Sequence, residues 1–240
     1  MSDESQQPSA LIFGARNLGR AIIEDLVRRG YAVAAVARSD STLELTTAAG
    51  ALALRADITD QASVADALRQ AADAHGRVDL AVNAAAAYGG TRSGPFGGGP
   101  IAEAAPDAFE SWSTAPARSA FAFLSAAGRF AVEQGGPATL VQVTGGSARR
   151  AMPGRGLWAA GAFAVRAITL AAAQELREQG IHVALLVVDA GIEPFEGAGG
   201  DPATADPREL AKAVAFLAEQ GARAATHELQ ITPLAERWVP

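Results

Sequence analysis

Short apolar segments alternate with longer segments of helical periodicity along most of this chain, and no other feature limits its fold as strongly. Residues 10–13 form an apolar run, residues 18–29 repeat apolar side chains at helical spacing, and residues 31–37 form a second apolar run. A strand, a helix and a strand in that order are typical of a βαβ unit with parallel strands. The same patterns predict strands at 51–54, 78–83, 139–143, 182–188 and 228–231, and helices at 60–75, 106–134, 157–178 and from 206 to about 220.

The predicted strands are apolar on both faces, which is typical of a parallel sheet covered by helices on each side. With 240 residues, 49% of them hydrophobic, the chain can bury the core of one large α/β domain. We detect no internal repeat. We therefore predict a single domain over residues 10–240, preceded by a flexible polar tail at residues 1–9.

Charge and composition exclude several classes of partner and chemistry. The net charge of -6 argues against nucleic acid or an anionic membrane as a partner. The absence of cysteine excludes disulfides, thiolate catalysis and cysteine-ligated zinc, and we expect no metal site. The N-terminal residues lack the pattern of a signal peptide, and no uncharged apolar stretch approaches membrane-spanning length. We expect a soluble cytoplasmic protein.

Two segments break the regular alternation. Residues 87–100 are rich in glycine, which predicts a variable loop or a lid. Pro116 falls inside the predicted helix at 106–134, where a proline removes one backbone hydrogen bond and clashes with the preceding turn. We expect that helix to be interrupted and kinked near Pro116.

A glycine-containing turn separates the first predicted strand from the first helix. Residues 14–19 read Gly-Ala-Arg-Asn-Leu-Gly, so the outer glycines of a Gly-x-Gly-x-x-Gly fingerprint are present and Arg16 replaces the middle one. Such a turn cradles a pyrophosphate at a helix N-terminus. On its own this motif is weak evidence for a dinucleotide site.

The end of the second predicted strand favours one dinucleotide over another. It reads Ala37-Arg38-Ser39 and has no acidic residue to accept a hydrogen bond from a ribose 2′-hydroxyl. Arg38 could instead bind a 2′-phosphate, with Arg16 as the other half of a clamp. NADP(H) is therefore favoured over NAD(H), the alternative being that both arginines are solvated surface residues.

Several segments together resemble the short-chain dehydrogenase/reductase family over roughly residues 10–195. They are the turn at 14–19, Asp57, Asn83 after the fourth strand, the strand end at 139–145 and the helix that carries Trp158. The resemblance implies a Rossmann-type, doubly wound parallel sheet of about seven strands, a dimer or tetramer, and a bound nicotinamide dinucleotide. The positions it implies for the cofactor are Gly14, Arg16, Asn17, Leu18, Gly19, Arg38, Asp57, Ile58, Asn83 and Ile192.

The catalytic residues of that family are missing at the matching positions. The resemblance aligns its Asn, Ser, Tyr and Lys with Pro116, Gly145, Trp158 and Ala162. An indole N–H donates a hydrogen bond but does not titrate usefully, and alanine supplies neither charge nor donor. We predict that the usual proton transfer is absent.

Other residues could replace part of the lost chemistry. Tyr88, after the fourth strand, is the best substitute phenol, and Ser147 is a plausible hydroxyl donor. Arg149, Arg150 and Arg155 precede the Trp158 helix and could bind an anionic substrate, although a solvated basic loop is the commoner explanation. The three histidines are interpreted as structural.

Three functions remain open. The first is a degenerate family member that binds NADP(H), weakly or not at all, and acts as a sensor or as a partner of an active homologue. The second is an NADP-dependent carbonyl or alkene reductase with a non-standard proton donor such as Tyr88 or Ser147. The third is a non-redox biosynthetic enzyme that uses the cleft to orient its substrate.

Overall fold

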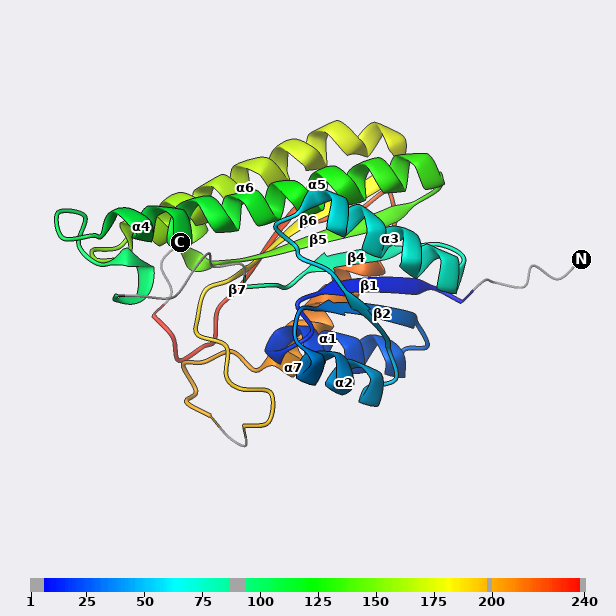
Figure 1. Ribbon diagram of the computed structural model, residues 1–240, viewed down its shortest axis with the longest axis horizontal. Helices are drawn as coiled ribbons and strands as arrows, with labels where there is room; N and C mark the ends of the chain where they lie inside the picture. The colour runs from blue at the N-terminus through cyan, green and yellow to red at the C-terminus, as the bar shows by residue number, and fades with distance from the viewer. Residues whose placement is uncertain (1–6, 87–93, 198–199, 238–240) are drawn as a thin grey trace, which may run out of the picture.

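A single parallel sheet forms the centre of the molecule (Figure 1). The computed structural model describes residues 7–86, 94–197 and 200–237. Within these residues seven strands lie in the order β3-β2-β1-β4-β5-β6-β7, and every neighbouring pair is parallel. The strands are β1 Ser9–Phe13, β2 Ala32–Ala37, β3 Leu52–Arg55, β4 Leu80–Asn83, β5 Ala138–Gly145, β6 Ile181–Val188 and β7 Glu228–Ile231. The predicted doubly wound α/β fold is confirmed.

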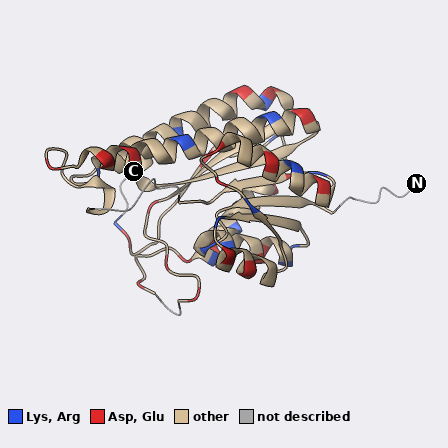
Figure 2. Ribbon diagram, in the orientation of Figure 1, with Lys and Arg blue, Asp and Glu red and all other residues tan. Residues whose placement is uncertain are grey.

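Helices cover both faces of the sheet. They are α1 Asn17–Arg28, α2 Asp40–Ala48, α3 Gln61–His75, α4 Pro106–Phe109, α5 Ala115–Gln134, α6 Gly156–Leu176 and α7 Pro207–Ala218. Helices α3, α5 and α6 lie on one side, and α1, α2 and α7 lie on the other (Figure 1). Charged residues of both signs are spread over the helices, whereas the strands carry few (Figure 2).

Strand β1 explains why the strands read as continuous apolar runs. Leu11 and Phe13 pack into the core beneath α3 and α5, whereas Ala10 and Ile12 pack into the core beneath α1 and α7. All four side chains are fully or almost fully buried. Successive side chains of a strand point to opposite faces, so a strand covered on both sides needs apolar residues at every position.

Helix α2 was not predicted from the sequence. Its two buried residues, Thr42 and Thr46, are threonines, and the hydroxyl of Thr46 donates to the carbonyl of Thr42 at 2.9 Å. The inward face therefore lacks the apolar spacing by which the other helices are recognised. Two other helices begin at capping aspartates, because Asp60 and Asp206 accept backbone N–H bonds at the starts of α3 and α7.

The predicted interruption near Pro116 takes the form of a wider helical turn. A π-helical segment, Glu110–Thr114, joins α4 to α5, and the backbone on both sides of the junction stays right-handed helical. Pro116 has no N–H to donate to the carbonyl of Trp112, four residues earlier. The π-turn absorbs this missing bond without ending the helix.

One helical segment is long and apolar enough to be compared with a membrane span, although it is not the uncharged stretch that the sequence analysis excluded, because Arg166 lies in its middle. The helical segment Gly156–Gln179 has 24 residues, a mean hydropathy of 1.5 and only 33% of its most apolar window buried, so by length and composition alone it could span a membrane. It is also the crossover between β5 and β6, and its Arg166 bonds to Glu228 of β7 at 2.7 Å.

Candidate functional site at the carboxyl edge of the sheet

The β1–α1 turn requires both of its glycines for packing. Gly14 has a φ of +94°, and a Cβ there would lie 2.6 Å from the Cα of Ala85 after β4. A Cβ on Gly19 would overlap the carbonyl oxygen of Gly14. These glycines are therefore explained by close packing within the turn, with or without a bound phosphate.

The first turn of α1 is chemically suited to an anion. Arg16 occupies the N-cap position, is exposed and makes no side-chain capping bond, and this turn contains no acidic residue. The Oδ1 atom of Asn17 is buried and has no hydrogen-bond partner among the described residues. Leu18 is buried in the core. Free backbone N–H groups and the positive end of the helix dipole favour a phosphate here.

Arg38 follows β2 at the same edge. Its side chain is exposed, and the guanidinium of Arg55 donates to its carbonyl oxygen and pairs with Asp40. The N–H of Gly14 donates to Val36 of β2 at 3.2 Å, which brings the ends of β1 and β2 together. The structure therefore places the segment with Arg16 and Arg38 after neighbouring strands.

Asp57 is held within its own turn. Its Oδ1 accepts hydrogen bonds from the N–H of Thr59 at 2.9 Å and from the Thr59 hydroxyl at 2.8 Å. Burial alone would raise the pKa of Asp57, but these two bonds and the positive charge of Arg38 lower it below its ordinary value. The neighbouring Ile58 points into the core.

Asn83 anchors the end of β4 rather than pointing into open space. Its side chain is only 1% exposed. The Nδ2 atom donates to Gln142 at 3.0 Å and lies 3.4 Å from the hydroxyl of Ser119, while Oδ1 accepts from the N–H of Ala85 at 3.2 Å. Gln142 and Ser119 were missed by sequence reasoning, because nothing local marks them as partners of Asn83.

An aromatic cluster, defined as Phe96, Trp112 and Trp158, contains the residue that the sequence analysis aligned with the catalytic tyrosine of the resembled family. The ring of Phe96 meets that of Trp158 edge to face at 4.5 Å and that of Trp112 at 5.0 Å. A Cβ added at Gly145 would lie 3.0 Å from Cζ2 of Trp158, which is tight for any side chain. The indole thus occupies the space beside the strand end that a serine at position 145 would need.

The start of α6 packs closely on the π-turn. A Cβ on Gly161 would lie 2.5 Å from the carbonyl oxygen of Trp112, and the hydroxyl of Ser113 donates to the carbonyl of Leu157 at 2.7 Å. Ala162 is 3% exposed, so the position matching the family lysine is filled by packing. No charge from that position faces the aromatic cluster.

Ser147 and Tyr88 are the two proposed substitute proton donors. Ser147 is 2% exposed, and its hydroxyl has no hydrogen-bond partner among the described residues. Tyr88 lies outside the described residues. Asp189, at the end of β6, pairs with Arg150 at 3.0 Å, and its carboxylate fills the space where a side chain on Gly146 would lie. This partly buried ion pair therefore packs on Gly146, the residue before Ser147.

Each arginine of the loop before α6 makes a contact within the protein. Arg149 pairs with Glu228 of β7 at 3.0 Å, and Arg150 pairs with Asp189. The guanidinium of Arg155 lies 5.3 Å from the ring centre of Phe96. These contacts account for the three side chains without an anionic ligand.

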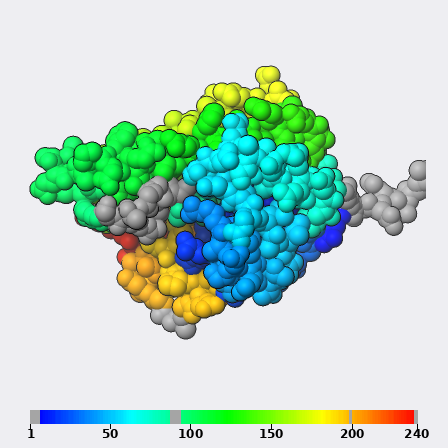
Figure 3. All heavy atoms as spheres, viewed as in Figure 1, coloured from blue at the N-terminus to red at the C-terminus, as the bar shows by residue number. Residues whose placement is uncertain are grey.

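The segment after β6 packs against helix α1. Ile192 forms a parallel bridge with Ala205, and the ring of Phe195 lies between the guanidinium groups of Arg20, at 4.6 Å, and Arg208, at 4.3 Å. In the space-filling view the gold and orange atoms of this region lie against the blue N-terminal unit (Figure 3). The sequence did not predict these contacts, because the residues that make them are far apart in the chain.

Comparisons with known proteins agree with this architecture. The model of a family described as enoyl-(acyl carrier protein) reductase matches residues 13–192. A sorbitol dehydrogenase from Cereibacter sphaeroides is 30% identical over 182 residues, which cover 73% of this chain and 67% of that protein.

Solved structures resemble the chain over almost its whole length. An alcohol dehydrogenase from Thermococcus sibiricus, complexed with 5-hydroxy-NADP, has a TM-score of 0.79 and 24% identity, and the match covers 97% of this chain and 99% of that one. A variant of a short-chain dehydrogenase/reductase from Serratia marcescens has a TM-score of 0.77 and 25% identity, with 95% and 97% covered.

Proposed function

This chain belongs to the short-chain dehydrogenase/reductase family, and we propose that it is a member that binds NADP(H) but lacks the family's usual proton-transfer chemistry. Its role would then be that of a sensor of the dinucleotide or of a partner subunit. The observation that carries this proposal is the contact between Trp158 and Gly145. The resemblance aligns these residues with the family tyrosine and serine, and the indole ring takes the space beside Gly145 that a serine side chain would need.

The remaining residues are better suited to binding a dinucleotide than to transferring a proton. When bound, NADP(H) supplies a hydride donor or acceptor. The free N–H groups of α1, with Arg16 beside them, would hold its diphosphate, and Arg38 would hold a 2′-phosphate. The unpartnered Oδ1 of Asn17 offers an acceptor for a hydroxyl of the ligand. In contrast, neither Trp158 nor Ala162 can give or take a proton.

Two observations support a preference for NADP(H) over NAD(H). The end of β2 carries Arg38 and no acidic residue that would bind a free ribose hydroxyl. The alcohol dehydrogenase from Thermococcus sibiricus, which shares this fold, is complexed with an NADP derivative. A guanidinium suits a phosphate because it offers two parallel N–H donors.

Calorimetric titration of the purified protein with NADPH and NADH tests the cofactor part of the proposal. We expect NADPH to bind more tightly, and Arg38→Gln to weaken NADPH by roughly tenfold or more while leaving NADH unchanged, because charged hydrogen bonds contribute about 1.5–3 kcal/mol. Arg129→Gln, an exposed arginine of α5, is the matched control. Equal binding of NADPH by both variants would rule out the Arg38 contact.

A turnover assay tests the catalytic part separately. Wild-type protein that binds NADPH should oxidise it with carbonyl substrates no faster than the solution background. Rates typical of reductases, in the range of about 1–10³ s⁻¹, would overturn the assignment of a degenerate site.

A second candidate is a reductase with a non-standard proton donor. It is favoured by Ser147, whose buried hydroxyl lacks a partner at the end of β5, and by relatives that are named as dehydrogenases or reductases. If this candidate is right, Ser147→Ala lowers the rate by roughly 10²–10⁴-fold without weakening NADPH binding. A rate insensitive to this change and to Tyr88→Phe would eliminate both donors.

We further propose that the protein self-associates, or pairs with an active homologue, through α5 and α6. Large apolar side chains are exposed along these helices: Phe121 at 55%, Val132 at 47% and Phe163 at 43%. Exposed apolar side chains of this size favour a protein interface where they gather into one patch. Light scattering should therefore detect a dimer or tetramer that Phe163→Glu converts to monomer, and a monomeric wild-type protein would leave only the hetero-oligomer.

A further inference from the structure

Three arginines stand at the carboxyl ends of three neighbouring strands. Arg16 follows β1, Arg38 follows β2, and Arg55 is the last residue of β3. The strand order β3-β2-β1 and the pairing of Ala37 with Arg55 place these ends side by side. The sequence did not mark Arg55 as a site residue, because it lies within a strand rather than in the turn that follows one.

The guanidinium of Arg55 joins the residues on either side of Ser39. Its Nη1 atom donates to the carbonyl oxygen of Arg38, and its Nη2 atom pairs with the carboxylate of Asp40. The side chain of Arg55 is 54% exposed and that of Asp40 is 86% exposed. An ion pair this exposed contributes little to folding stability. Its charges therefore matter mainly to a ligand that binds beside it.

The guanidinium of Arg38 is left for such a ligand. Within the part of the chain that the structure describes, it makes no ion pair and no hydrogen bond. Burial raises the pKa of Asp57, but hydrogen bonds from Thr59 and the positive charge of Arg38 lower it, so this guanidinium lies near the turn after β3. Arg38 and Arg55 thus flank the same corner of the carboxyl edge.

Asp40 is the group at this corner that opposes a phosphate. An unpaired carboxylate here would repel a ribose 2′-phosphate and would accept a hydrogen bond from a ribose 2′-hydroxyl. Both effects favour NADH over NADPH. Because Arg55 is paired with Asp40, the negative charge is neutralised and an acceptor oxygen is occupied. Loss of Arg55 would remove one positive charge from the corner and would also release a negative one.

We propose that Arg55 is a specificity-determining residue, which makes the site select NADP(H) by neutralising Asp40. This inference rests on the proposed binding of NADP(H), and it adds a residue to the two arginines that would contact the dinucleotide directly. Arg55 acts through its two neighbours: it bonds to the backbone of Arg38 and holds the carboxylate of Asp40. Its removal should therefore change the choice between the two dinucleotides rather than weaken both.

The experiment is a calorimetric titration of the full chain with NADPH and with NADH, for wild type, Arg55→Gln, Asp40→Asn and the double variant. We expect Arg55→Gln to weaken NADPH by about threefold to tenfold and not to weaken NADH. In the double variant most of the lost NADPH affinity should return, because the unpaired carboxylate is gone. The effect of Arg55→Gln should shrink between about 0.05 M and about 0.5 M salt, since exposed charges are screened.

Arg69→Gln is the matched control, because Arg69 forms an exposed pair with Asp66 in α3. Arg69 lies eight residues after Gln61, the first residue of α3, so it is about 12 Å farther along a helix that leads away from the carboxyl edge. That distance exceeds the screening length of about 8 Å at physiological salt. Arg69→Gln should leave both affinities unchanged.

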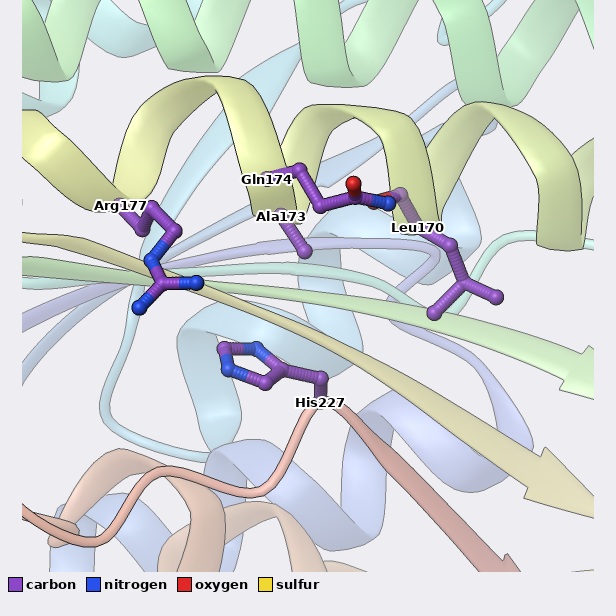
Figure 4. Close-up of a pocket in the computed structure, with 5 residues that line it drawn as sticks. All are labelled: Leu170, Ala173, Gln174, Arg177 and His227. Atoms are coloured by element: carbon purple, nitrogen blue, oxygen red, sulfur yellow. The ribbon is translucent and has the colours of Figure 1, made fainter.

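Arg177→Gln is a second control, for the loss of an exposed arginine at the opposite edge of the sheet. Figure 4 shows its surroundings, a hollow before the starts of β6 and β7 that is lined by Leu170, Ala173, Gln174, Arg177 and His227. A change in NADPH affinity in this variant as large as in Arg55→Gln would show an effect of net charge alone and would overturn the proposal.

The remaining outcomes separate this inference from the proposed function. If Arg38→Gln weakens NADPH whereas Arg55→Gln binds it like Arg69→Gln, NADP(H) binding stands and the role of Arg55 is overturned. Equal weakening of NADPH and NADH by Arg55→Gln, or no recovery in the double variant, would also overturn that role. Wild-type protein that binds neither dinucleotide would overturn both. The far-ultraviolet circular dichroism of each variant verifies that it is folded.

Discussion

The indole ring of Trp158 lies beside Gly145, so close that a side chain on the glycine would press against the ring. A Cβ at Gly145 would be 3.0 Å from Cζ2 of the ring. The other side of the indole contacts Phe96, which in turn contacts Trp112. These are the two positions that the resemblance aligns with the family serine and tyrosine, and here they form one packing contact.

Gly145→Ala is expected to destabilise the protein. The backbone at Gly145 has φ -97° and ψ 168°, which alanine adopts freely, so any cost comes from the ring of Trp158. Overpacking of this kind costs about 1–3 kcal/mol. Urea unfolding measures it, with Gly221→Ala as the control because a Cβ there meets nothing within 4 Å. The same substitution in a Trp158→Tyr background should cost less, and equal costs in both backgrounds would contradict the contact.

Restoring the four family residues should create a reductase activity. The quadruple variant Pro116→Asn, Gly145→Ser, Trp158→Tyr and Ala162→Lys regains a titrating phenol and a lysine beside it. We expect NADPH-dependent reduction of activated carbonyls to rise by roughly 10²–10⁴-fold over wild type. Trp158→Tyr alone should gain little, because without the lysine the phenol keeps a high pKa. A folded quadruple variant that binds NADPH yet stays inactive would contradict this prediction.

Gly161→Ala and Gly128→Ala form a matched pair on neighbouring helices. In each case alanine improves helix propensity by about 1 kcal/mol. The new methyl at position 161 meets the rigid carbonyl of Trp112 at 2.5 Å, whereas at position 128 it meets the flexible end of Leu176 at 2.9 Å. Gly161→Ala should therefore lower the urea midpoint, while Gly128→Ala should leave it unchanged or raise it. The opposite order would show that α6 does not pack on the π-turn this closely.

The pH dependence of stability should carry a contribution from Asp57. Hydrogen bonds from Thr59 and the charge of Arg38 outweigh burial and lower its pKa in the folded state. A lowered folded pKa means that the stabilisation is present above the unfolded value of 3.8 and is lost as the pH falls through the folded pKa. Thr59→Ala should raise the Asp57 pKa measured by carbon-13 NMR. An unchanged pKa in that variant would exclude the Thr59 hydroxyl as its cause.

Much of the architecture follows from local patterns. The strands around β1 are visible as continuous apolar runs because both faces of the sheet are covered, and the caps at Asp60 and Asp206 mark helix starts directly. Helix α2 escaped prediction because it buries Thr42 and Thr46 rather than apolar residues. The segment Gly156–Gln179 has the length of a membrane span but is not an uncharged stretch, and its Arg166 bonds to Glu228 of β7.

The sequence by itself determined that positions 158 and 162 carry a tryptophan and an alanine, and no packing can turn either side chain into an acid or a base. It also determined the order of strands and helices, because that order depends on local hydrophobic periodicity. Only the tertiary structure decided that Trp158 packs on Gly145, that Asn83 bonds to Gln142, and that Phe195 lies against Arg20 and Arg208. Each of these is a contact between residues far apart in the chain, and such contacts exist only once the core has packed.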